Sequence, residues 1–215
     1  MKLLFLGDSI TEGVGASCYE KCYVSLVGRK LGCEVVNYGV GGTRIARQEY
    51  VHNWTIWNYD FRLRVQIMDK SADKVFVFGG TNDYGHGRLP LGKTSDKDVK
   101  TFCSELKLLI EELLAKYKKE KLCFILPLRR FDEDGVCCKG ESGNEKGATL
   151  FEYVCAMRGI IEQYGIDVLD LYENGIAKPC VNTGDEFTAD GVHPNDKGYE
   201  IVAEKICEYI KNKGE

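Results

Sequence analysis

Short apolar runs recur along the chain, and each run ends at residues that favour turns. Five of them predict buried strands, at residues 2–6, 34–38, 74–78, 122–126 and 166–171. Their apolar positions are nearly continuous rather than alternating, which is typical of strands covered on both faces. The runs therefore predict a sheet that is buried between two layers.

Helical patterns lie between these runs. The clearest one spans residues 98–117, where apolar side chains recur at spacings of three and four: Val99, Phe102, Leu106, Leu109, Leu113 and Tyr117. Ser95 and Asp98 are placed like a capping box in front of it. A last helix is predicted over residues 195–211, and weaker patterns cover 22–31, 56–68 and 150–164. Strands that alternate with helices predict a parallel sheet between two layers of helices.

Size and composition limit what this fold contains. The chain has 215 residues, which predicts a single domain over residues 1–215. Its hydrophobic share of 44% and charged share of 29% are a globular balance. Lys and Arg are spread along the chain and the net charge is -4, so we expect neither a nucleic-acid partner nor an anionic membrane surface.

The chain begins Met-Lys-Leu-Leu-Phe-Leu, but its apolar run stops at Gly7 and is shorter than the ~7–15 residues of a secretory signal. No stretch reaches the length of a membrane span. We therefore predict a cytoplasmic protein without a membrane partner. The ten cysteines include no CxxC pair, so we expect reduced, mostly buried thiols rather than disulfides or a metal site.

Four polar segments follow predicted strands or precede the last helix. They are Gly-Asp-Ser-Ile-Thr at 7–11, Asn-Tyr-Gly-Val-Gly-Gly-Thr at 37–43, Gly-Gly-Thr-Asn-Asp at 79–83 and Asp-Gly-Val-His-Pro at 190–194. Ligands of parallel sheets bind at the carboxyl ends of the strands. We therefore expect the chemistry of this chain to be found in these segments.

Attack on an ester requires a nucleophile stronger than water. A serine hydroxyl serves when a histidine within hydrogen-bond reach accepts its proton, and a carboxylate fixes the tautomer of that histidine. Ser9, His193 and Asp190 supply these groups, with the last two three residues apart. The negative charge formed on the carbonyl oxygen needs fixed N–H donors. Ser9 N–H, Gly42 N–H and the Asn82 amide are the candidates for this oxyanion hole.

These four segments, in this order, resemble the sequence blocks of the SGNH hydrolase superfamily, the GDSL-like lipases, acylhydrolases and esterases. The resemblance spans almost the whole chain and implies Ser9, Gly42, Asn82 and His193 as the four name-giving residues, with Asp190 as the third triad member. It also implies a flavodoxin-like three-layer α/β/α sandwich with a five-stranded parallel sheet, and ester or thioester hydrolysis without metal or cofactor. Ile10 replaces the usual leucine, and Gly41 is an alternative to Gly42.

Six further residues near these segments are candidates for substrate contact, each with a structural alternative. The alternatives are turn formation, a surface position or core packing, and the six residues are Asp8, Arg44, Trp54, Asp83, His86 and Arg129. Asp8 and Asp83 are expected to hold turns. Trp54 belongs to an aromatic-rich stretch for which core packing is the default interpretation, and stacking on a sugar ring is the alternative.

Rival functions rest on weaker patterns. Residues 87–94 (GRLPLGKT) match the phosphate-loop pattern of nucleotide-binding proteins, but that motif requires a strand directly before it and a helix directly after it. A metallophosphoesterase built on Asp8, Asn82, Asp83, His86 and His193 would lack the usual paired ligands. A non-catalytic carbohydrate-binding domain would not need a complete triad.

The sequence therefore predicts a serine esterase that acts through an acyl-enzyme on Ser9. No insertion is long enough for a lipase-type cap, which favours short acyl chains. The family resemblance favours an acetyl ester of a carbohydrate, with a lysophospholipase or thioesterase as the alternative. The partner expected is a small-molecule ester, and the oligomeric state stays open.

Overall fold

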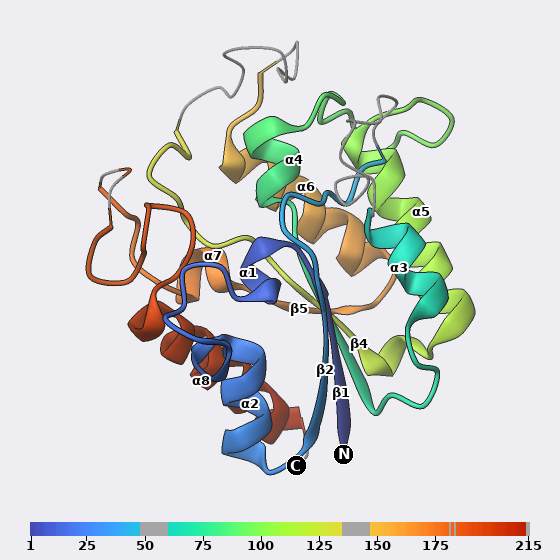
Figure 1. Ribbon diagram of the computed structural model, residues 1–215. Coiled ribbons are helices and arrows are strands. Elements are labelled where there is room, and N and C mark those ends of the chain that lie inside the picture. Colours follow the sequence, from blue (N-terminus) through green and yellow to red (C-terminus); the bar gives the residue numbers. More distant parts are fainter. Residues whose placement is uncertain (48–59, 135–146, 181, 183, 214–215) are drawn as a thin grey trace.

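A parallel five-stranded sheet forms the centre of the computed structural model, which describes residues 1–47, 60–134, 147–180, 182 and 184–213. The strands are β1 (Lys2–Gly7), β2 (Glu34–Gly39), β3 (Lys74–Phe78), β4 (Leu122–Ile125) and β5 (Asp167–Leu169). Their order in the sheet is β2-β1-β3-β4-β5 (Figure 1). This is the predicted flavodoxin-like arrangement, and all five predicted strands are present.

Helices cover both faces of this sheet. Their bounds are α1 (Ser9–Glu12), α2 (Tyr23–Leu31), α3 (Phe61–Ile67), α4 (Thr81–His86), α5 (Phe102–Lys116), α6 (Leu150–Gln163), α7 (Leu171–Asn174) and α8 (Asp196–Lys213), with short 3-10 turns at Tyr19–Lys21 and Lys119–Lys121. Helices α2 and α8 lie on one face, and α3, α5 and α6 lie on the other (Figure 1).

Side chains of β1 alternate between the two resulting cores. Leu4 and Leu6 are buried against the layer of α3, α5 and α6, whereas Leu3 and Phe5 are buried against α2 and α8. Successive side chains of a strand point to opposite faces, so a strand that is apolar at every position fits only the middle of three layers. The predicted three-layer α/β/α fold is thus confirmed.

The start of α5 differs from the prediction. The helix begins at Phe102, with a capping box formed by Thr101 and Ser104 rather than by Ser95 and Asp98. Asp96 instead accepts hydrogen bonds from Lys93 N and the Thr101 hydroxyl, which closes a turn in front of the helix. Val99, predicted to lie on the apolar stripe, is 61% exposed because it precedes the first helical turn.

A buried arginine ties the carboxyl ends of β1 and β2 together. Arg64, on α3, is 1% exposed, and its guanidinium donates to Gly7 O at 2.6 Å, to Thr43 Oγ1 at 2.8 Å and to Tyr38 O. Buried carbonyl groups at strand ends need such donors, because water does not reach them. The ends of the two strands are thereby held beside each other.

None of the helices in the described ranges is both long and apolar enough to span a membrane. The cytoplasmic location stays a prediction.

Candidate active site

Ser9 lies on a sharp turn between β1 and α1. Asp8 caps the helix by accepting a hydrogen bond from Ile10 N at 3.0 Å, and Ser9 is the first helical residue. A Cβ atom at Gly7 would lie 1.8 Å from Thr11 Oγ1 and 2.8 Å from Phe78 O, so only glycine fits there. The turn presents the Ser9 hydroxyl at the carboxyl end of a central strand, between the ends of β2 and β3.

The hydroxyl of Ser9 begins a line of three hydrogen-bonded side chains. Ser9 Oγ lies 2.9 Å from His193 Nε2, and His193 Nδ1 lies 2.7 Å from Asp190 Oδ2. The other oxygen of Asp190 accepts hydrogen bonds from Val192 N at 3.0 Å and His193 N at 2.8 Å. These are the three residues that the sequence nominated, and the fold brings them together from positions 184 residues apart.

Hydrogen bonding keeps the Asp190 carboxylate ionised. Partial burial by itself raises the pKa of this group, but the hydrogen bonds from the backbone and ring of His193 outweigh that effect, so that the pKa lies below its usual value. An ionised carboxylate on Nδ1 holds the proton there and leaves Nε2 free to accept one from Ser9. The geometry therefore suits a general base.

The loop that carries His193 rests on the loop after α1. Gly15 has a φ of 93°, and a Cβ atom at this position would lie 2.5 Å from Pro194 O and 3.1 Å from His193 Cβ. Ser17 adds two hydrogen bonds to Asp196, from its backbone N at 2.8 Å and its hydroxyl at 2.7 Å. These contacts hold the loop after α1 against the segment that carries His193.

Replacement of Gly15 by alanine should therefore lower activity. The added methyl group pushes against Pro194 and His193, and displacement of a reacting group by about 1 Å can reduce the rate by ~100-fold. We expect kcat to fall by roughly 10- to 100-fold, measured by ester hydrolysis at saturating substrate. Gly32→Ala is the matched control, because Gly32 also has a positive φ, of 59°, but has open space around it. Equal activities of the two variants would contradict this prediction.

The loop after β2 supplies the candidate oxyanion donor. Gly41 N donates to Glu12 Oε2 at 2.7 Å, whereas Gly42 N–H has no acceptor within the described part of the chain. A Cβ atom on Gly41 would lie 3.7 Å from Ser9 Cβ, which places this loop directly beside the nucleophile. The hydrogen bonding therefore favours Gly42 over Gly41 as the free donor, as the family resemblance implied.

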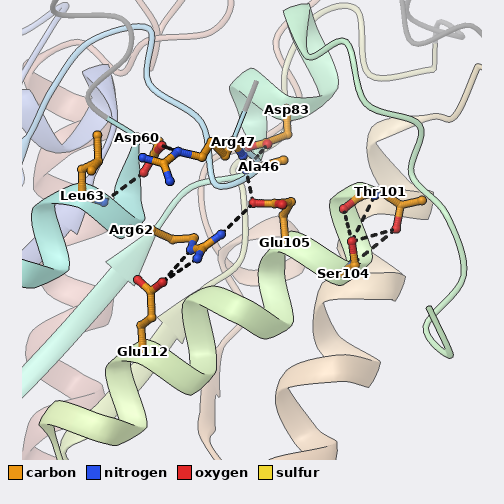
Figure 2. Close-up of polar contacts among 10 residues, drawn as sticks. All are labelled: Ala46, Arg47, Asp60, Arg62, Leu63, Asp83, Thr101, Ser104, Glu105 and Glu112. Atoms are coloured by element: carbon orange, nitrogen blue, oxygen red, sulfur yellow. Dashed lines mark hydrogen bonds and ion pairs between the residues drawn. The ribbon is translucent and has the colours of Figure 1, made fainter. Parts of the chain in front are cut away.

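Buried carboxylates hold the next residues of this loop. Asp83 accepts hydrogen bonds from Ile45 N at 3.0 Å and Ala46 N at 2.8 Å, and Glu105 accepts one from Arg47 N at 3.3 Å. Figure 2 shows Asp83 and Glu105 beside Ala46 and Arg47, and Glu105 is also paired to Arg62 at 3.2 Å. Three successive backbone N–H groups, those of residues 45–47, thus donate to buried carboxylates in the segment that follows Gly42.

Burial raises the pKa of two carboxyl groups in this region. Desolvation brings the pKa of Asp8 to about 6 and that of Asp83 to about 6, against hydrogen bonds from backbone N–H groups that lower both values. A carboxyl group with a raised folded-state pKa binds its proton more tightly when folded. Its contribution to stability is therefore full below pH 4 and is lost as the pH rises through about 6.

The variant Asp8→Asn should reveal this dependence. We expect the difference in unfolding free energy, wild type minus variant, to fall by about 3 kcal/mol between pH 3 and pH 7, at about 1.4 kcal/mol per pKa unit. Urea denaturation at a series of pH values measures it. The control is Asp185→Asn: hydrogen bonds from Phe187 N and Thr188 outweigh burial and lower the pKa of Asp185, so its difference should change in the opposite direction. A pH-independent difference for Asp8→Asn would argue against a raised pKa.

The remaining candidates have structural partners. Asp8 and Asp83 accept hydrogen bonds from backbone N–H groups, which agrees with the expectation that they hold turns. Arg129 is paired with Glu133 at 2.9 Å and packs on Tyr172, and Trp54 lies outside the described residues. Arg44 contacts His86, and His86 in turn contacts Asn82. Substrate contact by any of the six stays a prediction.

The structural context required by the phosphate-loop pattern and by the metallophosphoesterase hypothesis is not found in the described residues. Residues 87–94 follow helix α4 rather than a strand, and α5 begins only at Phe102, so no phosphate loop is formed. Among the described residues, no group of three or more His, Cys, Asp or Glu side chains is arranged to hold a metal ion.

The comparison with protein families decides the classification. The model of the GDSL-like lipase/acylhydrolase family matches residues 5–201. The chain belongs to this family. Membership confirms the family that the four segments predicted and supports the predicted enzyme class, a carboxylic ester hydrolase.

Individual relatives extend this comparison. An acetylxylan esterase from Xylanibacter ruminicola is 25% identical over 226 residues, which cover 98% of this chain and 43% of that protein. This chain thus spans less than half of that relative. A protein from Lactobacillus plantarum has a similar structure, with a TM-score of 0.80, 25% identity, and coverage of 98% of this chain and 96% of that one. An acetyl xylan esterase shares the fold at a TM-score of 0.66 and 22% identity, with coverage of 98% and 100%.

Sequence reasoning missed several residues that shape the site. Arg64 fits a helical pattern, and nothing in that pattern marks it as buried. Glu12 is a charged residue in a short turn, and only the structure shows that it holds Gly41 N–H. Gly15 did carry a signal, a second glycine directly after the nucleophile segment, but its contact with His193 needed the fold.

Proposed function

We propose that the protein hydrolyses small acyl esters through an acyl-enzyme on Ser9. The observation that carries this proposal is the line from Ser9 Oγ to His193 Nε2, at 2.9 Å, and from His193 Nδ1 to Asp190 Oδ2, at 2.7 Å. Both distances lie in the range of good hydrogen bonds, and the order of groups is that of an activated serine. Membership of a lipase and acylhydrolase family supports the same chemistry.

The reaction has two halves. His193 Nε2 accepts the proton of Ser9 as its Oγ attacks the ester carbonyl, and Asp190 stabilises the imidazolium that forms. The imidazolium then donates that proton to the departing alcohol, which leaves an acyl group on Ser9. In the second half His193 takes a proton from water, the resulting hydroxide attacks the acyl group, and the proton returns to Ser9 as the acid departs. In both halves Ser9 N–H, Gly42 N–H and the Asn82 amide bind the oxyanion.

The substrate we propose is an acetyl or other short acyl ester, with a carbohydrate as its alcohol. The acetylxylan esterase from Xylanibacter ruminicola supports this choice, since 98% of this chain aligns with it. A lysophospholipase or thioesterase is the alternative, because it would use the same triad on a longer or sulfur-linked acyl group.

A panel of esters, together with a serine-reactive inhibitor, tests both the proposed substrate and the proposed mechanism. p-Nitrophenyl esters from acetate to palmitate, acetylated xylan or acetylated sugars, and an acyl-CoA would be compared by kcat/KM. We expect the acetate ester to be turned over faster than the palmitate ester and the acyl-CoA. A serine-reactive phosphonate should stop the reaction and appear on the peptide that contains Ser9 in mass spectrometry. Preference for palmitate would reject the short-chain proposal, and inhibition without labelling of Ser9 would reject the mechanism.

A further inference from the structure

A row of polar side chains leads from a buried arginine to the amide of Asn82. Arg44 NH1 lies 2.8 Å from His86 Nδ1 and also donates to His86 O at 3.2 Å. At the other side of the ring, His86 Nε2 lies 3.1 Å from Asn82 Oδ1. Asn82 Nδ2 donates to Thr43 O at 3.0 Å. The row joins α4 to the loop after β2, the two segments that bring Asn82 and Gly42 to the oxyanion hole.

The chemistry of these groups allows one arrangement of hydrogen atoms. A guanidinium group only donates, so His86 Nδ1 must accept, and the single ring hydrogen of a neutral imidazole must then be on Nε2. That N–H donates to Asn82 Oδ1, and the amide NH2 faces Thr43 O. The flipped amide would place Oδ1 against the Thr43 carbonyl and NH2 against the ring N–H, which loses both hydrogen bonds.

We propose, on the basis of the function proposed above, that His86 is a positioning residue that orients the Asn82 amide for the oxyanion. One amide hydrogen is used on Thr43 O, and the fixed orientation keeps the second one available as the donor. Arg44 secures the tautomer of His86, and it is 7% exposed, so solvent does not compete strongly for its donors. All donors in the row point in the same direction, from Arg44 towards the oxyanion, and hydrogen bonds in such a chain polarise one another.

Spacing and hydrogen bonding suit this role better than substrate binding. His86 is four residues after Asn82 on α4, so the two side chains share one face of the helix. Both ring nitrogens already have protein partners, and the ring cannot bind a substrate without releasing Asn82 or Arg44. Oxyanion donors act only when they are fixed before the charge develops. A side chain that fixes such a donor should therefore affect kcat rather than KM.

Variants at positions 86 and 44 test the proposal with p-nitrophenyl acetate. His86→Phe keeps a flat ring but removes both nitrogens, and Arg44→Met removes the group that sets the tautomer. We expect each to lower kcat by about 10-fold, less than the ~100-fold or greater loss when an oxyanion donor is removed, with KM changed less than about twofold. His86→Gln offers one acceptor and one donor in similar positions, and it should recover kcat to within about threefold of wild type.

A double variant at positions 82 and 86 distinguishes a positioning role of His86 from a general structural role. Residues that act through one group give non-additive losses, so Asn82→Ala/His86→Phe should be no slower than Asn82→Ala alone. Tyr117→Phe is the control: it removes a hydrogen bond of 2.6 Å to Asp69 O near the amino-terminal end of the sheet and should leave kcat unchanged. Melting temperatures show whether each variant is folded, and Arg44→Met and His86→Gln still decide the question if His86→Phe unfolds.

Three results would overturn the inference: wild-type kcat in both His86→Phe and Arg44→Met, full additivity with Asn82→Ala, or no recovery in a folded His86→Gln. These outcomes differ from failure of the proposed function, in which the wild-type protein itself would show no hydrolysis that depends on Ser9. An active wild type together with any of the three results removes only the role of His86.

Discussion

Ser9→Ala should lower kcat by roughly 10³- to 10⁶-fold and leave KM within a few-fold of wild type. The methyl group cannot form the acyl-enzyme, so only the oxyanion donors and substrate binding continue to assist attack by water. The side chain of Ser9 is 7% exposed and its hydroxyl has His193 as its partner, so the variant should lose about 1 kcal/mol of stability at most. Burst and steady-state kinetics with p-nitrophenyl acetate measure the loss, and urea denaturation measures the stability.

Another serine provides the matched control. Ser71 Oγ donates to Asp69 Oδ1 at 2.8 Å, so Ser71→Ala also loses one hydroxyl and one hydrogen bond. It lies directly before β3, at the end of the sheet away from Ser9. We expect Ser71→Ala to keep the kcat of wild type. If Ser9→Ala also kept it, hydrolysis would not pass through an acyl-enzyme on Ser9.

The sheet and the polar segments could be predicted because each depends on local sequence. Short apolar runs rich in β-branched and aromatic residues, such as residues 74–78, favour strands, and the observed β3 has the same bounds, Lys74–Phe78. The parallel order then places all strand ends at one edge. The structure brings Ser9, Asp190 and His193 together at this edge for that reason. Their catalytic role stays a prediction until the variants are measured.

The short helices were not predicted, because they do not produce a periodic pattern of apolar residues. Helices α1 and α7 have four residues each and α4 has six, too few for an apolar stripe to repeat. Two of them begin at aspartate caps, Asp8 and Asp170, directly after a strand. The predicted start of α5 was wrong for a related reason. Ser95 and Thr101 are both favourable caps in sequence, and the turn closed by Asp96 lies in front of a helix capped by Thr101.

Contacts between side chains that are distant in the sequence could not be predicted either. His86 was expected to lie near the site, but its place between Arg44 and Asn82 depends on how α4 meets the loop after β2. The same holds for Arg64, whose burial depends on carbonyl groups from two strand ends. Residue types therefore identify the groups that react, and the fold identifies the groups that hold them.

His193→Ala should have the second large effect, a fall in kcat of roughly 10⁴- to 10⁶-fold. Without the imidazole, the proton of Ser9 has no acceptor during attack, and the departing alcohol has no donor. The loop itself should survive, because the backbone hydrogen bond from Ala189 N to His193 O, at 2.8 Å, does not use the side chain. Steady-state hydrolysis of p-nitrophenyl acetate measures kcat, and circular dichroism with a melting curve checks the fold.

The double variant Ser9→Ala/His193→Ala sharpens this test, because the two side chains act as a unit and their losses should not add. It should be no slower than either single variant. Asp190→Asn should fall between His193→Ala and wild type, at roughly 10⁴-fold below wild type, since it leaves an imidazole in place but in the wrong tautomer. Retention of more than about a tenth of wild-type kcat by His193→Ala would show that another group accepts the proton of Ser9. Additive losses in the double variant would show that the two residues act separately, despite the 2.9 Å between Ser9 Oγ and His193 Nε2.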